Sequence, residues 1–155
     1  MKFSSREDIE APVSDVFDML SEFESFERSA IRRGVEVERL SDATTPQCGM
    51  KWRAQFDLRG KRRDLSVELV EFDRPNAMKF QADSQGLDGA MTLELLALSP
   101  RRTRLSVDLD LTPKTLSARL LVQSLKLAKS SLTKRFKLRV AGFAKDMEDR
   151  HSRLA

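Results

Sequence analysis

Few side chains in this sequence have the types and spacing that catalysis requires. The chain has one histidine, His151, which lies in the charged C-terminal tail, and one cysteine, Cys48. Zinc and iron–sulfur sites need several such ligands, so these counts argue against both, and we expect no metal or other cofactor. The sequence also lacks a glycine-rich phosphate loop and a nucleophile elbow. Carboxylates therefore remain as the candidate acids or bases.

Most carboxylates alternate with apolar residues along predicted strands and should face solvent, among them Asp57, Glu68, Glu94, Asp108 and Asp110. Glu7 differs because it shares the strand parity of Phe3 and Ile9 and should point inwards, where an unpaired carboxylate is costly. We expect a partner for it. Arg139, in the predicted core-facing arc of the C-terminal helix, could pair with Glu7 or bind an anionic ligand group. A Glu7 side chain that reaches water at the strand end is the alternative.

The longest apolar pattern runs from Thr115 to about Asp149 and predicts a helix. Apolar residues step by three or four along one face: Leu121, Leu125, Ala128, Leu132, Phe136, Val140, Phe143 and Met147. A straight helix of this length would reach roughly 50 Å, well beyond a globule whose radius of gyration is about 15 Å. A second set of leucines, at 116, 120, 127 and 138, projects from the opposite side. We therefore predict a break between about Val122 and Ser131.

The preceding residues predict strands and two short helices. Residues 1–10 alternate as a strand, and Pro12 opens a helical pattern that continues to about Ile31, split into two short helices. Six strands follow, with apolar rows in 35–40, 50–59, 64–72, 78–82, 91–97 and 105–111. The turns between them fall at 60–63, 73–76, 85–89 and 99–102. This order favours an α+β fold with an antiparallel sheet around the terminal helix.

Composition indicates one ordinary globular domain over residues 1–155. The hydrophobic fraction of 40% is that of a folded protein, and a chain of 155 residues can bury a sizeable core. A lone Cys48 cannot form an internal disulfide, which fits a reducing compartment. The N-terminus has no signal-peptide run, and no stretch has the apolar length of a membrane span. We therefore expect a cytoplasmic protein.

The formal net charge of +4 is unevenly distributed. Basic residues recur between Lys114 and Lys145 without one acidic residue, whereas the earlier part of the chain is slightly acidic. This excess predicts weak contact with an anionic membrane surface, and the alternative is a solvated helix face. We expect no nucleic-acid partner, since no recognised motif accompanies the charge and tyrosine is absent. The oligomeric state cannot be read from these patterns.

The order of elements and several segments resemble a known superfamily. The run Ile9-Glu10-Ala11-Pro12 leading into Val16-Phe17, residues 49–59 followed by 67–75, and the closing amphipathic helix are similar to the START-like superfamily (SRPBCC, Bet v 1-like), in particular its polyketide cyclase/dehydrase and lipid transport group. The resemblance implies a helix-grip fold, in which a curved antiparallel sheet wraps around a long C-terminal helix and encloses an apolar cavity. In that superfamily the cavity holds lipids, polyketides or similar molecules.

Two functions stay open at this point. The first is binding or transport of a small hydrophobic ligand in a cavity of about 300–1,000 Å³ between sheet and helix. The predicted lining residues are Glu7, Trp52, Phe56, Leu69, Phe80, Leu93, Leu95, Phe136, Arg139 and Val140. The second is a cyclase- or dehydratase-like enzyme that uses a buried carboxylate in the same cavity. The lack of a histidine, tyrosine or metal constellation favours the non-enzymatic reading.

Overall fold

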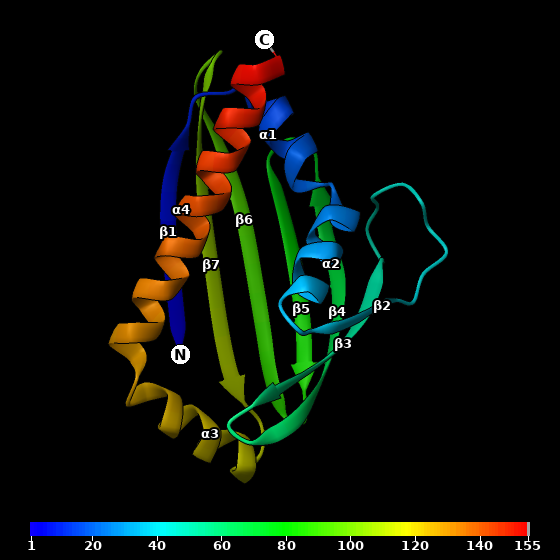
Figure 1. The fold of residues 1–155 in the computed structure, drawn as a ribbon, viewed down its shortest axis with the longest axis vertical. Helices are drawn as coiled ribbons and strands as arrows, with labels where there is room; N and C mark the ends of the chain where they lie inside the picture. Colours follow the sequence, from blue (N-terminus) through cyan, green and yellow to red (C-terminus); the bar gives the residue numbers. More distant parts are fainter. Residues whose placement is uncertain (155) are drawn as a thin grey trace.

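The computed structural model describes residues 1–154, which form seven strands and four helices. The strands are β1 (Lys2–Ile9), β2 (Glu36–Arg39), β3 (Lys51–Leu58), β4 (Lys61–Asp73), β5 (Ala77–Ser84), β6 (Leu87–Ser99) and β7 (Arg102–Pro113). The helices are α1 (Val13–Leu20), α2 (Phe23–Arg32), α3 (Leu116–Lys126) and α4 (Lys129–Leu154). Figure 1 shows α4 running along the sheet, with α1 and α2 beside it.

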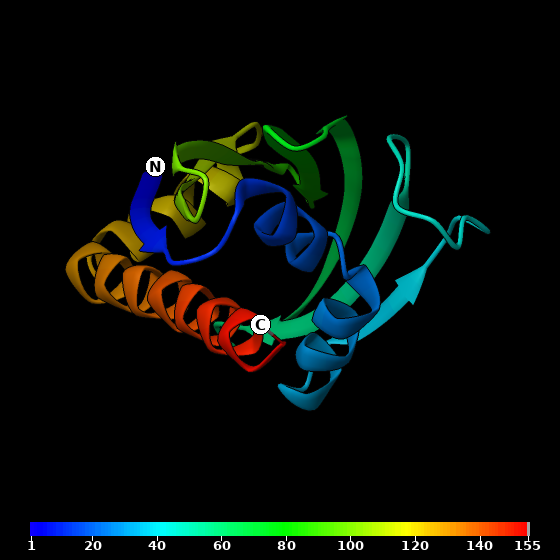
Figure 2. The same cartoon turned by 90° about the horizontal axis from the view of Figure 1, so that it is seen from above.

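The strands form one antiparallel sheet in the order β1-β7-β6-β5-β4-β3-β2. The sheet is strongly curved, and the helices lie on its concave side (Figure 2). Inward-facing apolar residues alternate with polar ones, as expected for a sheet with one face on the core. The predicted α+β helix-grip fold, with its antiparallel sheet and long C-terminal helix, is confirmed.

Two hairpin turns are tighter than the sequence predicted. Arg59 and Gly60 take φ values of 54° and 72°, and Gln85 and Gly86 take 51° and 88°. Two residues with positive φ match the twist of the flanking strands, so each strand pair continues up to the turn. The predicted turn at 60–63 was therefore too long, because Lys61 already begins β4 and Arg63 lies inside it.

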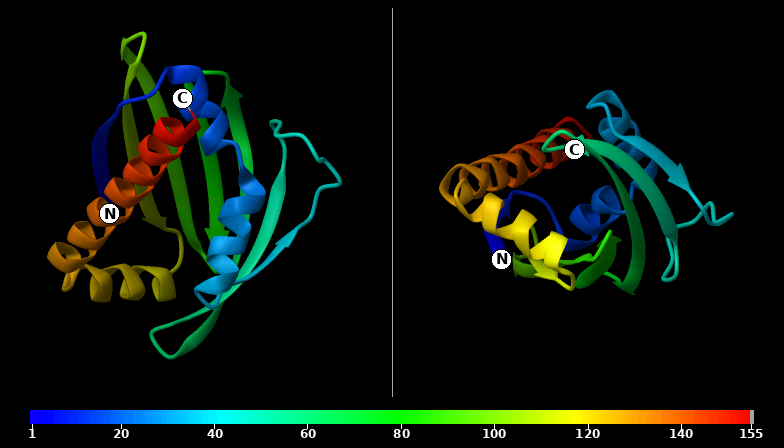
Figure 3. Two further views of the ribbon diagram at one scale, coloured as in Figure 1. Left: turned by 45° about the horizontal axis from the view of Figure 1, so that its top comes forward. Right: turned by 90° about the horizontal axis from the view of Figure 1, so that it is seen from below.

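The predicted break in the terminal helix is confirmed. α3 ends at Lys126 and α4 begins at Lys129, with Leu127 and Ala128 between them. α3 then lies across one end of the sheet instead of extending α4 into solvent (Figure 3). The predicted opposite set of leucines is exposed, and among the described helices none has the length and apolar composition needed to cross a bilayer.

The start of α3 is fixed on the β5–β6 turn. Thr115 caps the helix, since its side-chain oxygen accepts a hydrogen bond from the backbone of Ala118 at 3.1 Å. The backbone N–H of Lys114 donates to the carbonyl of Gly86 at 2.7 Å. A Cβ added to Gly86 would lie 2.5 Å from the Thr115 methyl group. Only glycine at this position therefore lets α3 approach the turn so closely.

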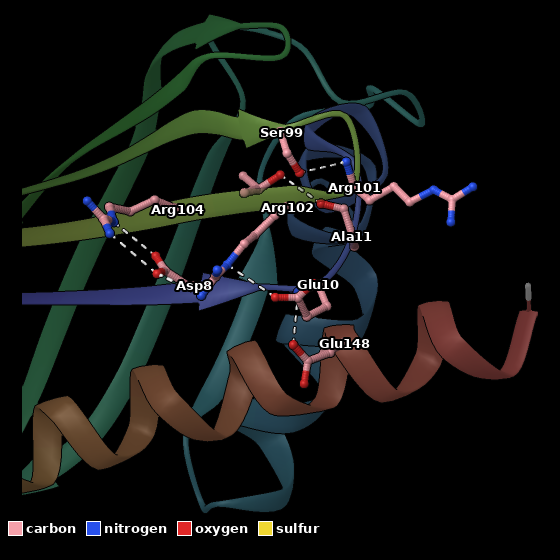
Figure 4. A network of polar contacts seen from close by, with 9 residues as sticks. Asp8, Glu10, Ala11, Ser99, Arg101, Arg102, Arg104 and Glu148 are labelled. Atoms are coloured by element: carbon pink, nitrogen blue, oxygen red, sulfur yellow. Dashed lines mark hydrogen bonds and ion pairs between the residues drawn. The ribbon is translucent and has the colours of Figure 1, made fainter.

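A polar network joins β1, β7 and the end of α4 (Figure 4). The Arg104 Nε donates to the Asp8 carboxylate at 2.9 Å, and Arg102 contacts the Glu10 carboxylate at 3.1 Å. The Glu10 backbone N–H in turn donates to the Glu148 side chain on α4 at 2.8 Å. Edge strand β1 is thereby tied to its neighbour on one side and to the helix that covers it on the other.

Candidate ligand-binding site

The concave face is well packed at one end. Five of the predicted lining residues are buried there in the hydrophobic core: Trp52, Leu69, Leu93, Leu95 and Val140. The core also takes in α1, the start of α2 and the C-terminal half of α4, through residues such as Phe17 and Met147. These side chains fill the space between the sheet and the helices at this end. They form the wall of any cavity and hold the helices in place.

Aromatic rings line the middle of the concave face. The Phe23 ring lies edge-on to Trp52 and to Phe80, with ring centroids 5.4 Å and 6.1 Å apart. Across the sheet, Phe136 of α4 contacts Phe3 of β1 with centroids 5.8 Å apart. Phe80 and Phe136 are half-buried and pack against the core. Trp52 is buried, while Phe136 keeps part of its surface open.

Glu27 and Arg39 hold the Trp52 ring in an arrangement, called the polar clamp below, that was not predicted from the sequence. The Trp52 indole Nε1 donates to the Glu27 carboxylate of α2 at 2.7 Å, and Arg39 of β2 donates to the same oxygen at 2.8 Å. The Glu27 and Arg39 side chains are 21% and 19% exposed, so water screens their ion pair less than one at the surface. The clamp fixes the ring plane of Trp52 in the wall of the concave face.

The other end of the concave face leaves apolar side chains partly open. Half-buried inward-facing residues there are Phe56, Leu58, Leu65, Val67, Met91, Leu109 and Leu111 on the sheet, and Leu121, Leu132 and Phe136 on the helices. Ala82 and Gly89 pair across β5 and β6, and because neither has a large side chain, no bulky group stands up from the sheet at this point. A Cβ added at Gly89 would contact only the Leu111 and Ala82 side chains within 4 Å. Apolar surface that the chain does not cover itself is typical of a binding site.

Arg63 is a half-buried charged residue on this face. It shares the strand parity of Leu65 and Val67 and pairs with Phe56 across β3 and β4. Its side chain is half-buried and donates to the Leu58 carbonyl at 3.4 Å, and no ion pair to it is found among residues 1–154. The signal was present in the sequence, since Arg63 continues the inward row of β4. It was missed because Arg63 was assigned to the predicted turn at 60–63.

Glu7 and Arg139 do not form the predicted pair. Glu7 is half-buried and faces α4, whereas Arg139 is exposed, and within the described chain no hydrogen bond or ion pair joins them. The prediction that Arg139 lies in the core-facing arc is wrong, because α4 packs through Val140 and Ala144 and this turns the preceding residue towards solvent. Glu7 instead lines a groove of about 440 Å³ between β1 and α4, together with Ser130, Thr133, Lys134, Lys137, Leu138 and Ala141.

A second groove of about 350 Å³ lies beside the Glu27–Arg39 clamp. Its lining is mixed in charge and includes Ser21, Glu22, Phe23, Glu24, Ser25, Arg28, Arg39, Thr44, Pro46 and Met50. Cys48 is exposed and its thiol donates to the Val70 carbonyl at 3.2 Å. His151 lies 3.5 Å from the Asp15 carboxylate, away from the concave face. Among residues 1–154, no group of three or more potential metal ligands is found.

Solved structures with the same architecture are found at low sequence identity. A START superfamily protein from Mycobacterium smegmatis gives a TM-score of 0.56 at 15% identity, covering 86% of this chain and 95% of its own. The aromatase/cyclase Zhui from Streptomyces sp. R1128 gives 0.67 at 15% identity, with 97% and 94% covered. Norcoclaurine synthase from Thalictrum flavum gives 0.66 at 11% identity, with 96% and 84% covered. These likenesses establish the fold, and no curated protein matches the sequence significantly.

The curved sheet around a long helix is the helix-grip fold of these structures, and the resemblance to the START-like superfamily expected from the sequence is confirmed by the match of a family model. Within that superfamily, the chain belongs to the polyketide cyclase/dehydrase and lipid transport family, whose model matches residues 1–148. Members of this superfamily include both binding proteins and enzymes, so the family alone does not decide whether this chain catalyses a reaction.

Proposed function

We propose that this protein binds and carries a small hydrophobic ligand on the open half of its concave face. The observation that carries the proposal is the set of inward-facing apolar residues that remain half-buried there, from Phe56 and Val67 to Met91 and Leu109. An interior built only for stability would cover these side chains, because fully burying an exposed apolar side chain contributes about 1.5–3 kcal/mol and half-buried ones realise only part of it. A ligand with apolar surface would cover them instead.

Arg63 suggests that the ligand has an anionic or strongly polar end. Its guanidinium lies at the rim of the apolar surface and has donors left for a carboxylate, sulfonate or phosphate group. The rest of the ligand would lie against Phe56 and Phe80 and reach towards the Trp52 ring. Lipid-like and polyketide-like molecules both fit this description, and it agrees with the lipid transport and polyketide chemistry of the family name.

Two fluorophores of different charge test this proposal. The anionic probe 1-anilinonaphthalene-8-sulfonate and the neutral probe Nile red should both bind wild type. Ala82→Leu places a larger side chain on the concave face and should weaken the binding of both probes about tenfold. Ala90→Leu, on the convex side of β6, should leave the binding of both probes unchanged. Arg63→Gln should weaken only the anionic probe, by about tenfold. Equal binding of both probes to wild type and Ala82→Leu would refute the site.

A cyclase-like activity is the second candidate, and one observation favours it. Glu27 is a partly buried carboxylate next to an aromatic-lined surface, as an acid–base residue would be. Its two hydrogen bonds to Arg39 and Trp52, however, hold it as a structural acceptor. We therefore rank ligand binding first. Native mass spectrometry of gently purified protein would separate the two, since a carrier retains one unchanged species while an enzyme converts a supplied polyketide.

A further inference from the structure

The outer face of α3 carries leucines that nothing in the described chain covers. Leu116 and Leu120 of α3 are 72% and 64% exposed, and Leu127, the residue directly after the helix, is 92% exposed. They are spaced by four and seven residues, so they lie on one side of the helix. The opposite side is buried through Ala118, Val122 and Leu125. α3 is therefore apolar on two faces, of which the fold uses one.

Basic side chains flank the exposed leucines. Arg119 and Lys126 each precede a leucine of this face by one position, and Lys129 follows Leu127 at the corner into α4. All three are exposed, and no acidic residue lies between Lys114 and Lys145. An apolar helix face bordered by cations is the pattern of helices that lie in the interface of an anionic bilayer. The leucine face is defined here as Leu116, Leu120 and Leu127 with these three cations.

The positive charges of the leucine face also distinguish between the partners that could cover it. A second copy of the chain would bring the same cations against each other, which costs free energy. A nucleic acid would use the cations but not the leucines, and the leucine face has no aromatic ring for stacking. An anionic lipid surface satisfies both kinds of side chain, since the headgroups attract the cations and the acyl boundary receives the leucines.

We infer that the leucine face of α3 docks the protein on anionic lipid bilayers. α3 lies across the end of the sheet and packs on β7, the strand that carries the half-buried Leu109 and Leu111 (Figure 3). Docking through α3 therefore places the open half of the concave face beside the membrane. The inference goes beyond the proposed ligand binding and stands without it, because the docking surface is separate from the residues that would contact a ligand.

Vesicle sedimentation tests the docking surface. The probes are vesicles of phosphatidylcholine alone and of phosphatidylcholine with phosphatidylglycerol, at low and at physiological salt. Wild type should bind only the anionic vesicles. The triple variant Leu116→Ser, Leu120→Ser, Leu127→Ser should lose about tenfold or more of this binding at both salt concentrations. The variant Arg119→Gln, Lys126→Gln, Lys129→Gln should lose most at low salt, where screening is weakest.

The matched control is a triple serine variant of exposed leucines elsewhere, Leu40→Ser, Leu96→Ser, Leu98→Ser, which should bind vesicles as wild type does. Thermal unfolding and Nile red binding in solution should be unchanged in all variants, which separates a docking failure from a folding or ligand-site failure. The inference is overturned if wild type ignores anionic vesicles at low salt, or if the α3 leucine variant binds as tightly as wild type. It is also overturned if wild type is a dimer that this variant dissociates.

Discussion

Removing the Glu27 carboxylate should destabilise the protein more than removing a surface carboxylate does. Glu27 accepts hydrogen bonds from Arg39 and from the Trp52 indole, and the Glu27 and Arg39 side chains are about four-fifths covered. In Glu27→Ala the indole N–H and the guanidinium both lose their acceptor in a place that water reaches poorly. A lost partner of this kind costs about 1–3 kcal/mol, more for a charged group.

Working from these contacts, we expect Glu27→Ala to lower the free energy of unfolding by about 2–4 kcal/mol. Glu27→Gln keeps an acceptor for the indole and loses only the charge that faces Arg39, so it should cost about 1–2 kcal/mol. The control is Glu22→Gln, whose ion pair with Arg150 is 41% and 42% exposed. Exposed pairs contribute about 0–1 kcal/mol.

Urea unfolding measures these differences. Trp52 is the one tryptophan of the chain, so its fluorescence reports directly on the clamp, and far-UV circular dichroism provides a second probe of global unfolding. The Trp52 emission of Glu27→Ala should also shift to longer wavelength in the folded state, because the ring gains freedom and contact with water. If Glu27→Gln and Glu22→Gln were equally stable, the ion pair with Arg39 would contribute no more than an exposed pair, and the account of the clamp would be wrong.

Three further predictions follow from burial, backbone geometry and charge. Phe17→Ala, in the fully buried core, should cost about 3–5 kcal/mol in urea unfolding, whereas Phe136→Ala should cost less because that ring is half-buried; equal costs would argue against an open concave face. Gly86→Ala should lower the urea midpoint of unfolding and the protection of the α3 backbone amides from hydrogen exchange, because residue 86 has a φ of 88° and lies close to the Thr115 methyl group. Unchanged hydrogen exchange would contradict the packing of α3. The Arg104 hydrogen bond lowers the pKa of Asp8 from its ordinary value of 3.8, so the stability that Asp8 contributes is present above that pH and is lost as pH falls through the lowered pKa. The difference in melting temperature between wild type and Asp8→Asn should therefore be largest at neutral pH and disappear in acid, whereas a difference that does not change with pH would refute this prediction.

Most of the fold could be predicted because strand and helix periodicities are local. Alternation in 50–59 and 105–111 identified inward faces that the structure confirms at Trp52 and Leu105. The helix break was predictable for a different reason, since one straight helix over this stretch would extend well beyond a globule of this size. What local patterns do not contain is the exact rotation of a helix. For that reason Arg139 was predicted to face the core, whereas in the structure it is exposed and the next residue, Val140, is buried.

The polar contacts of the site could not be predicted, because they join residues that are distant in sequence. Glu27 and Trp52 are 25 positions apart, and Glu27 and Arg39 are 12 apart. One signal was available: Val35, Val37 and Arg39 share strand parity, so Arg39 had to face inwards and find an acceptor. Its partner depends on how α2 crosses β2 and β3, which only the tertiary structure shows.

The break between α3 and α4 explains why the open part of the concave face and the exposed leucines occur at the same end of the molecule. At the end of the sheet that holds the core, the C-terminal half of α4 packs together with α1 and the start of α2, and Val140, Ala144 and Met147 are buried there. At the other end the chain changes direction at Leu127, and the inward face of α3 packs on β7, while apolar sheet residues there stay partly open. The same turn directs the leucines of α3 outwards, because a helix that packs through Ala118 and Val122 must present Leu116 and Leu120 on its far side. One local irregularity therefore produces both the opening and the surface that we infer places it against a membrane. A variant that lengthened α4 through this corner should lose both properties together.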